Sequence, residues 1–345
     1  MKLPGLQTAR RAPLYIFLHI PKCAGTTFRH HVEHNLKEGE FVFFYVGDYF
    51  DVREMKRKYF TCTKRRKEID SYLSCLTCEQ KARVKILYGH HVYYGIHRFF
   101  PDREPRYVTF IRHPLGRMLS LYNSHRDHVE NPFRYISEQE NVCRTKELQN
   151  VHKDIVQRGR VLSFSEWLKR RTWQWNFMAK FLKQQGFAGP NDSAEEILRK
   201  FYLVGVTERF QTSALFLYHL LGITKFYPDQ NASPAYIRPD SLSKNMRDSI
   251  VRKNASDTKL YEQALYSNRI FKTKTPYPYI VVLYMKFRMR FSSPQTATPH
   301  FETPAQLIYN VSFSMRQHFP LYSRSLDYLK KNFLFEASNW LKWKE

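Results

Sequence analysis

A lysine, a glycine and two threonines follow an apolar run near the start of the chain, in the segment HIPKCAGTTF at residues 19–28. The apolar run, Tyr15–Ile20, is short and continuous, as a strand buried on both faces should be. A helix that begins here would offer free N–H groups to an anion, beside the Lys22 charge and the close backbone approach that Gly25 allows. The segment therefore predicts an anion site. The alternative is an ordinary strand-to-helix turn with a solvated lysine.

A second segment, FIRHPLGRMLSLY, repeats this plan further along the chain. The apolar run Tyr107–Ile111 ends in Arg112, and Pro114 suits the first turn of a helix. Arg112 and Ser120 stand on either side of that turn, so both can reach one phosphate, the arginine through a bidentate fork. Neither G-x-x-x-x-G-K-[ST] nor G-x-G-x-x-G occurs, which argues against a kinase-like NTPase and a dinucleotide dehydrogenase. Two anion-binding strand ends fit a ligand with two anionic ends.

Together the two segments resemble the phosphate-binding elements of the sulfotransferases that use 3′-phosphoadenosine 5′-phosphosulfate (PAPS). The resemblance is to the carbohydrate branch, sulfotransferase family 2, with its heparan sulfate 2-O- and 6-O-sulfotransferases and bacterial relatives. It spans residues 14–270 and extends to the segments YGHHVYYGIHRF, WNFMAKFL, FYLVGVTERF and NASDTKLYEQAL. The chain departs from the family pattern at His113, where aspartate is common, and at Cys23, where many members have threonine.

The resemblance implies a role for each motif. Lys22 would contact the sulfate and the bridging oxygen, while Arg112 and Ser120 would hold the 3′-phosphate. The 5′ end would be held by Pro21, Lys22, Cys23, Ala24, Gly25, Thr26 and Thr27. A weaker similarity gives Thr207 and Arg238 to the nucleotide. No metal is implied, because lysine and backbone dipoles can carry the charge.

A general base for such a reaction should titrate near neutrality. Three histidines, His90, His91 and His97, follow the apolar run Val84–Tyr88. The resemblance places the family's catalytic histidine on His91, with His90 as the runner-up. Arg117 would contact either an acidic acceptor or a surface carboxylate.

The elements that must position these residues alternate between apolar runs and helical stretches. Strands are expected at Tyr15–Ile20, Phe41–Val46, Val84–Tyr88, Tyr107–Ile111 and Tyr202–Val206. Helices are expected at Thr26–Lys37, Pro114–Asp127 and Glu208–Leu221, and from a capping box at Ser163–Glu166 through Arg170. This order predicts an α/β fold with a central, mainly parallel sheet flanked by helices, and the resemblance implies the P-loop-NTPase-like version of it.

The rest of the chain is assigned around this sheet. Residues 12–270 are expected to form one sulfotransferase domain, and 271–345 a basic, aromatic-rich C-terminal extension with helical and irregular parts. Residues 47–82 and 129–162 are polar and show no period, so they are interpreted as insertions. Three aromatic residues are expected in the core rather than in a sugar-binding platform: Trp173, Trp175 and Phe177.

The formal net charge is +25, from 56 lysines and arginines against 31 aspartates and glutamates in 345 residues. Such an excess favours polyanionic partners, a merely solvated basic surface being the alternative. With the resemblance, it indicates a glycan acceptor that can itself be polyanionic, and it is compatible with peripheral membrane contact. No homeodomain, zinc-finger or RNP1 pattern occurs, so no specific nucleic-acid partner is expected.

No window of about 18 apolar residues occurs, and the first apolar run leads directly into the anion-site motif, so neither a transmembrane segment nor a signal peptide is expected. The expected location is the cytoplasm of a bacterium. The alternative is the Golgi lumen, for a eukaryotic chain without its anchor. The cysteines, among them Cys75 and Cys78, are expected as free thiols ahead of a local disulfide or a structural metal. Four N-x-S/T sequons do not by themselves indicate secretion: Asn191, Asn231, Asn254 and Asn310.

The leading hypothesis is a carbohydrate O-sulfotransferase that acts by in-line displacement with a histidine base. Sulfation of a tyrosyl protein or of a small-molecule alcohol is the alternative activity, because the resemblance covers the nucleotide site and the acceptor site cannot be read from the sequence. A non-catalytic polyanion-binding protein on the same scaffold and an RNA-binding protein are the alternatives from other classes.

Overall fold

The computed structural model describes residues 12–44, 62–132, 151–225 and 234–266, and the backbone of two short strands between the first two of these ranges. Contacts within the chain divide it into two units, Met1–Arg269 and Ile270–Glu345. The second unit and the expected extension at 271–345 lie outside the described residues. Among the residues described, no helix is both long and apolar enough to cross a membrane.

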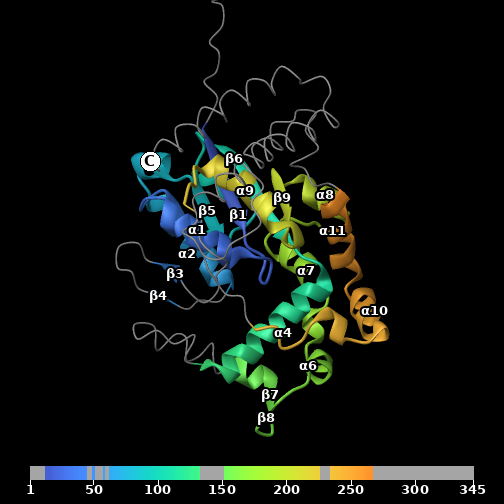
Figure 1. The fold of residues 1–345 in the computed structure, drawn as a ribbon. Coiled ribbons are helices and arrows are strands. Elements are labelled where there is room, and N and C mark those ends of the chain that lie inside the picture. Colours follow the sequence, from blue (N-terminus) through green and yellow to red (C-terminus); the bar gives the residue numbers. More distant parts are fainter. Residues whose placement is uncertain are drawn as a thin grey trace, which may run out of the picture. The chain divides into compact units, whose positions relative to one another are not determined.

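A seven-stranded sheet with the order β4-β3-β2-β5-β1-β6-β9 forms the centre of the first unit (Figure 1). Its five parallel strands are β1 (Pro13–Leu18), β2 (Phe41–Phe44), β5 (Ile86–Gly89), β6 (Glu104–Ile111) and β9 (Leu203–Val206). The short strands β3 (Tyr49–Phe50) and β4 (Arg57–Lys58) add an antiparallel edge. The sequence prediction of an α/β fold with a mainly parallel sheet is confirmed.

The order of the parallel strands creates a switch point at β1. The chain passes from β1 through β2 to β5 on one side of β1, and then continues with β6 and β9 on the other side. In register, Leu18 at the end of β1 pairs with Gly89 of β5 and with Thr109 of β6. Ligands of open parallel sheets bind at the carboxyl ends of strands beside such a switch point. The carboxyl ends of β5, β1 and β6 are therefore the first place to look for a site.

The sheet is covered on one face by α1 (Gly25–Asn35) and α9 (Phe210–Leu221). Phe17 of β1 stacks on Phe28 of α1 with 4.5 Å between ring centroids, and Phe28 stacks in turn on Tyr218 of α9 at 5.7 Å. Phe17 also stacks on Phe110 of β6 at 5.6 Å. Phe17 and Phe28 have no exposed surface. This aromatic packing holds α1, and with it the loop that precedes α1, at a fixed height above the sheet.

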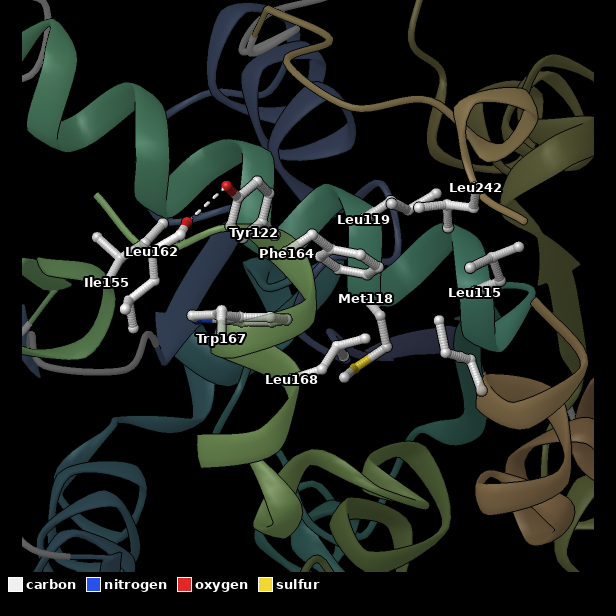
Figure 2. Close-up of a cluster of buried hydrophobic side chains, with 11 residues drawn as sticks. Leu115, Met118, Leu119, Tyr122, Ile155, Leu162, Phe164, Trp167, Leu168 and Leu242 are labelled. Atoms are coloured by element: carbon white, nitrogen blue, oxygen red, sulfur yellow. Dashed lines mark hydrogen bonds between the residues drawn. The ribbon is translucent and has the colours of Figure 1, made fainter. Parts of the chain in front are cut away.

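A second hydrophobic cluster surrounds the long helix α4 (Pro114–Glu130) and the helix α6 (Phe164–Arg170), beside the hairpin of β7 (Val156–Gln157) and β8 (Arg160–Val161) (Figures 1 and 2). Trp167 of α6, which is fully buried, meets Tyr122 of α4 edge-on at 5.6 Å. The Tyr122 hydroxyl donates a hydrogen bond of 2.8 Å to the Leu162 carbonyl, the dashed line in Figure 2. The capping box predicted at Ser163 and Glu166 is confirmed.

Four further α-helices lie in the second half of the described part: α7 (Phe177–Gln184), α8 (Ala194–Arg199), α10 (Lys244–Lys253) and α11 (Ala255–Tyr266). Helix α11 packs against α7, α8 and β9. Buried Asp257 of α11 accepts hydrogen bonds from the Met178 and Ala179 amides at 3.1 and 2.8 Å. A carboxylate there satisfies amides that α7 itself leaves unpaired, so α11 determines where α7 begins.

Residues 47–82, interpreted as an insertion without a clear period, include α2 (Cys62–Cys75) and most of α3 (Cys78–Arg83). Helix α2 is anchored at Asp70, which accepts hydrogen bonds from the Tyr93 hydroxyl and from Arg98. These partners lie far along the chain, so the local sequence gave no sign of them. Likewise, part of 129–162 forms the β7–β8 hairpin.

Cys75 and Cys78 are exposed free thiols, as expected, and Cys23 is a buried one. In the ranges given above, no group of three or more histidine, cysteine, aspartate or glutamate side chains could hold a metal. Asn254, the third sequon asparagine, is 1% exposed and donates a hydrogen bond to the Ile250 carbonyl. An oligosaccharide cannot be carried there in the folded protein, because the amide nitrogen is buried.

Candidate functional site

The carboxyl ends of neighbouring strands bring together most of the predicted site residues. Lys22 follows β1, His90 and His91 follow β5, and Arg112 follows β6. Thr207 follows β9, the next strand outward, and begins a short 3-10 helix, η4 (Thr207–Arg209). Residues separated by almost two hundred positions in sequence therefore lie at the same end of the sheet, the carboxyl ends of its parallel strands.

His97 is not part of this group. It lies in the 3-10 helix η1 (Ile96–Phe99), and its Nδ1 atom is 2.8 Å from the Tyr107 hydroxyl. Tyr107 pairs with Ile16, well before β6 reaches its carboxyl end. His97 is therefore held against the middle of the sheet.

The loop between β1 and α1 has the backbone conformation of an anion-binding turn. Lys22 and Ala24 are left-handed, with φ of 69° and 62°, and the α-helix begins directly at Gly25. Alternation between left- and right-handed residues directs successive N–H groups into one concavity. No side chain caps α1, and its first turn carries no acidic residue. The first-turn amides and the positive end of the helix dipole can therefore serve an anion.

Lys22 and Arg112, the key residues of the two predicted anion sites, are in direct contact. The Arg112 Nη1 atom donates a hydrogen bond of 2.9 Å to the Lys22 carbonyl oxygen. The Arg112 Nε atom and the Thr207 hydroxyl are buried and make no hydrogen bond within the described residues. A buried polar atom without a partner is costly, so these two donors are suited to a ligand that accepts hydrogen bonds. The two anion-binding segments thus form one continuous site.

Burial, reinforced by the charges of Arg112 and Arg117, lowers the pKa of Lys22 to about 8. A bound anion would oppose this effect and keep the ammonium protonated. Above pH 8 the free protein must then take up a proton when it binds an anion. The affinity for 3′-phosphoadenosine 5′-phosphate (PAP) is therefore expected to fall as pH rises above about 8, by up to about tenfold per pH unit. Calorimetric titrations between pH 7 and 10, in buffers of different ionisation enthalpy, measure this proton uptake.

The matched variant for that experiment is Lys22→Met, which removes the titrating group. It is expected to bind PAP more weakly and without the pH dependence above pH 8. A wild-type affinity that stays constant over this range would contradict the assignment of Lys22 to the anion site.

The structure gives a reason for a glycine at position 25 that the sequence did not suggest. A Cβ atom at this position would lie 2.0 Å from Nε2 of His19, so the glycine makes room for the imidazole ring and not only for a ligand. The ring is held from its other side, because the Tyr88 hydroxyl is 3.1 Å from His19 Nδ1 and donates 2.5 Å to the Gly25 carbonyl. His19 thus packs against the loop that carries Lys22 and helps to fix its position.

Gly25→Ala is expected to lower the free energy of unfolding by about 1–3 kcal/mol, because the new methyl group overlaps a buried ring. Urea unfolding measures the change. The control is the same substitution in a His19→Ala background, where the overlap is absent and the loss should largely disappear. Equal losses in both backgrounds would show that the ring is not the cause.

The two candidate base histidines differ in their contacts. His90 Nδ1 is 2.6 Å from the His19 carbonyl oxygen, and the His90 ring stacks on the His19 ring at 4.2 Å. Because a carbonyl only accepts, this contact places the proton of a neutral His90 on Nδ1 and leaves Nε2 unprotonated. The His91 amide instead donates to the Phe44 carbonyl at the end of β2, away from β1. Both histidines are at least nine-tenths buried.

Arg117 is not the surface residue that one of the two sequence interpretations proposed. It is 2% exposed, its Nη2 atom donates to the Gln174 side chain, and its guanidinium lies 4.1 Å from the centroid of the Phe177 ring. Burial lowers the pKa of Arg117 to about 10, and the charge still contributes to the field at Lys22. A contact with a surface carboxylate is therefore excluded.

Two other predicted nucleotide contacts lie along α4. Ser120 is half-buried on this helix. One turn further, the Asn123 side chain forms two hydrogen bonds with the backbone of Ile237, at 3.0 and 3.1 Å. These bonds hold Ile237, the residue before the exposed Arg238, against α4 one turn from Ser120.

Sequence reasoning missed four residues that position the site: His19, Tyr88, Gln174 and Glu208. The Glu208 carboxylate accepts from the His113 amide at 3.0 Å, at the start of α4, and so fixes the helix that follows Arg112. His19 could have been noticed, because it directly precedes the lysine motif. The others act through contacts between distant segments. The expectation that Trp173 lies in the core is wrong, since 52% of it is exposed, whereas Trp175 and Phe177 are half-buried.

The fold is a parallel α/β sheet. At its switch point, the loop after β1 is suited to an anion, and the cationic end of β6 lies beside that loop. These features are typical of an α/β protein that binds a phosphorylated ligand. Residues 10–270 match the family model described as the sulfotransferase family, and the chain belongs to this family. It is accordingly a PAPS-dependent transferase. No curated protein matches the chain.

Proposed function

We propose that this protein transfers the sulfuryl group of PAPS to a hydroxyl group of a carbohydrate. The observation that carries the proposal is the bond between Arg112 and the Lys22 carbonyl, which unites two anion sites into one elongated site. PAPS is anionic at its phosphosulfate end and at its 3′-phosphate. The uncapped start of α1 with Lys22 suits the first group, and Arg112 with Ser120 suits the second.

The donor supplies an activated sulfuryl group, and the chain's residues have to hold it, stabilise charge and accept a proton. The acceptor oxygen forms a bond to sulfur while the bond from sulfur to the bridging oxygen breaks, and the electron pair of that bond remains on the bridging oxygen. Lys22 and the first amides of α1 are suited to stabilise this developing charge. No metal needs to take part in these steps.

We assign the general base to His90, the runner-up of the sequence analysis, in preference to His91. In support, the His90 Nδ1 proton is directed at the His19 carbonyl, so the unprotonated Nε2 is the atom that can take the acceptor's proton. His90 also directly follows Gly89, which pairs with Leu18 at the end of β1, and Lys22 lies four residues beyond Leu18. The His91 amide, by contrast, bonds to the Phe44 carbonyl at the end of β2.

A carbohydrate acceptor is supported by two features of the chain. The resemblance of its motifs is to the carbohydrate branch of the family, and the net charge of +25 favours acidic polymers. Tyrosyl peptides and small alcohols remain the comparison acceptors for the experiment.

The test is transfer of labelled sulfate from PAPS to a panel of desulfated glycosaminoglycans, neutral glycans, tyrosyl peptides and small alcohols. Preferential labelling of a glycan is the expected result. Transfer to peptides or alcohols alone would replace the proposed acceptor. PAP binding without transfer to any acceptor would favour a non-catalytic polyanion-binding protein.

A further inference from the structure

Trp173 is unusual among the large hydrophobic residues of the structure. It lies in the 3-10 helix η3 (Thr172–Gln174), between α6 and α7, and 52% of its surface is exposed. In the described ranges only three other large hydrophobic residues are classed as exposed, and all three are tyrosines. An exposed indole does not contribute the free energy that burial of its ring would give, so packing alone does not explain a tryptophan at this position.

A continuous series of ring contacts connects this indole with the candidate site. The Trp173 ring meets Phe177 edge-on at 6.4 Å, Phe177 stacks on Phe181 at 5.7 Å, and Phe181 meets His90 edge-on at 6.5 Å. The residue next to Phe177, Met178, approaches the Cys23 thiol of the anion loop within 3.9 Å. Trp173 therefore stands at the outer end of a wall whose inner end is the proposed base.

The neighbour of Trp173 on its other side also belongs to the site. Gln174 accepts a hydrogen bond from buried Arg117, whose guanidinium lies over the ring of Phe177. The charge of Arg117 is in turn felt at Lys22. The residue next to the indole is thus held by Arg117, whose charge acts on Lys22.

Three cationic residues directly precede the segment Thr172–Gln174 that carries the indole: Lys169, Arg170 and Arg171. Lys169 and Arg170, at the end of α6, are exposed and form no ion pair within the described residues. Arg171, which is bound to Asp154, places its guanidinium 5.2 Å from the centroid of the Trp173 ring. An aromatic face beside unpaired cations is complementary to a ring that is flat, polar at its edges and negatively charged.

We infer that Trp173 is a stacking platform for an acidic sugar of the glycan acceptor, one that lies outward of the sugar receiving the sulfate. The apolar face of the pyranose ring packs on the indole, and its carboxylate faces Lys169 and Arg170. This inference rests on the proposed function and narrows it to an extended, uronate-bearing acceptor. A monosaccharide acceptor would reach the base without reaching the indole.

The experiment compares Trp173→Ala and Trp173→Phe with Tyr202→Ala in the full chain. Tyr202 is 42% exposed and directly precedes β9. It therefore lies at the amino ends of the parallel strands, whereas the site lies at their carboxyl ends, and it is a matched control. The acceptors are a desulfated uronate-containing oligosaccharide, a neutral oligosaccharide and a single sugar. Trp173→Ala is expected to raise KM for the uronate oligosaccharide about tenfold, the equivalent of ~1.4 kcal/mol, with kcat and PAP affinity unchanged. Trp173→Phe should recover part of the loss, and Tyr202→Ala should have no effect.

Binding provides a second measurement that does not depend on turnover. In the presence of PAP, the uronate oligosaccharide should change the tryptophan fluorescence of the wild type, and Trp173→Phe should abolish the change. An equal KM of wild type and Trp173→Ala for every acceptor would overturn the platform, even where wild type transfers sulfate well. If the wild type sulfates no glycan at all, the proposed function fails first, and the platform fails with it.

Discussion

Lys22→Met is expected to lower kcat for sulfuryl transfer by about 10²–10³-fold, the range typical for the loss of one group that stabilises charge in a transition state. The lysine follows β1 in a loop whose left-handed residues, Lys22 and Ala24, suit the binding of an anion by backbone amides, and Arg112 donates a hydrogen bond to the Lys22 carbonyl oxygen. Removing the ammonium leaves this framework in place, because no hydrogen bond that shapes the loop comes from the side chain in the described structure. The loss should therefore appear mainly in kcat.

Transfer of labelled sulfate at saturating PAPS measures this effect, and PAP affinity by calorimetry separates binding from chemistry. Lys259→Met, which removes an exposed lysine of α11, is the matched control and should behave as the wild type. If Lys22→Met bound PAP much more weakly while its kcat at saturating PAPS stayed unchanged, Lys22 would be a binding residue only.

His90→Asn is expected to lower kcat by about 10²–10⁴-fold, the usual contribution of a general base. Asparagine can keep the hydrogen bond to the His19 carbonyl that Nδ1 makes, but it has no atom that replaces Nε2. The variant should therefore fold and bind PAP normally. The measurement is the pH profile of kcat/KM, in which the acidic limb that reports the base should disappear.

His91→Asn is the control for this experiment, since His91 is the neighbouring residue and is buried to a similar degree. It is expected to retain activity within a few fold. The opposite result, with His91→Asn inactive and His90→Asn active, would return the base to His91, as the sequence resemblance implies.

The parallel sheet could be predicted from sequence because its strands are local features. The runs around Tyr15–Ile20 and Tyr107–Ile111 are continuous and apolar, and only strands buried on both faces require this pattern. The helices α2, α7 and α11 were not predicted as elements. Their positions depend on contacts between distant segments, such as the bonds of Asp70 with Tyr93 and Arg98, or those of Asp257 with the start of α7.

The same division holds for the site. A strand, a loop and a helix N-terminus are consecutive in sequence, so the anion loop at Lys22 and the cationic strand end at Arg112 could both be proposed before the structure was known. The contacts of the two adjacent histidines could not be predicted in this way. They depend on the pairing of β5 with β1 and with β2, which brings His90 to the His19 carbonyl and the His91 amide to the Phe44 carbonyl.

The fold class, the family and two segments suited to anions could be read from the sequence, because each is encoded within a short stretch of chain. The bond that joins these two segments, the space that Gly25 leaves for His19 and the exposure of Trp173 follow only from the three-dimensional packing. The physical reason is that exposure and contact are properties of packing between segments. Composition and spacing along one segment cannot specify what the other segments cover.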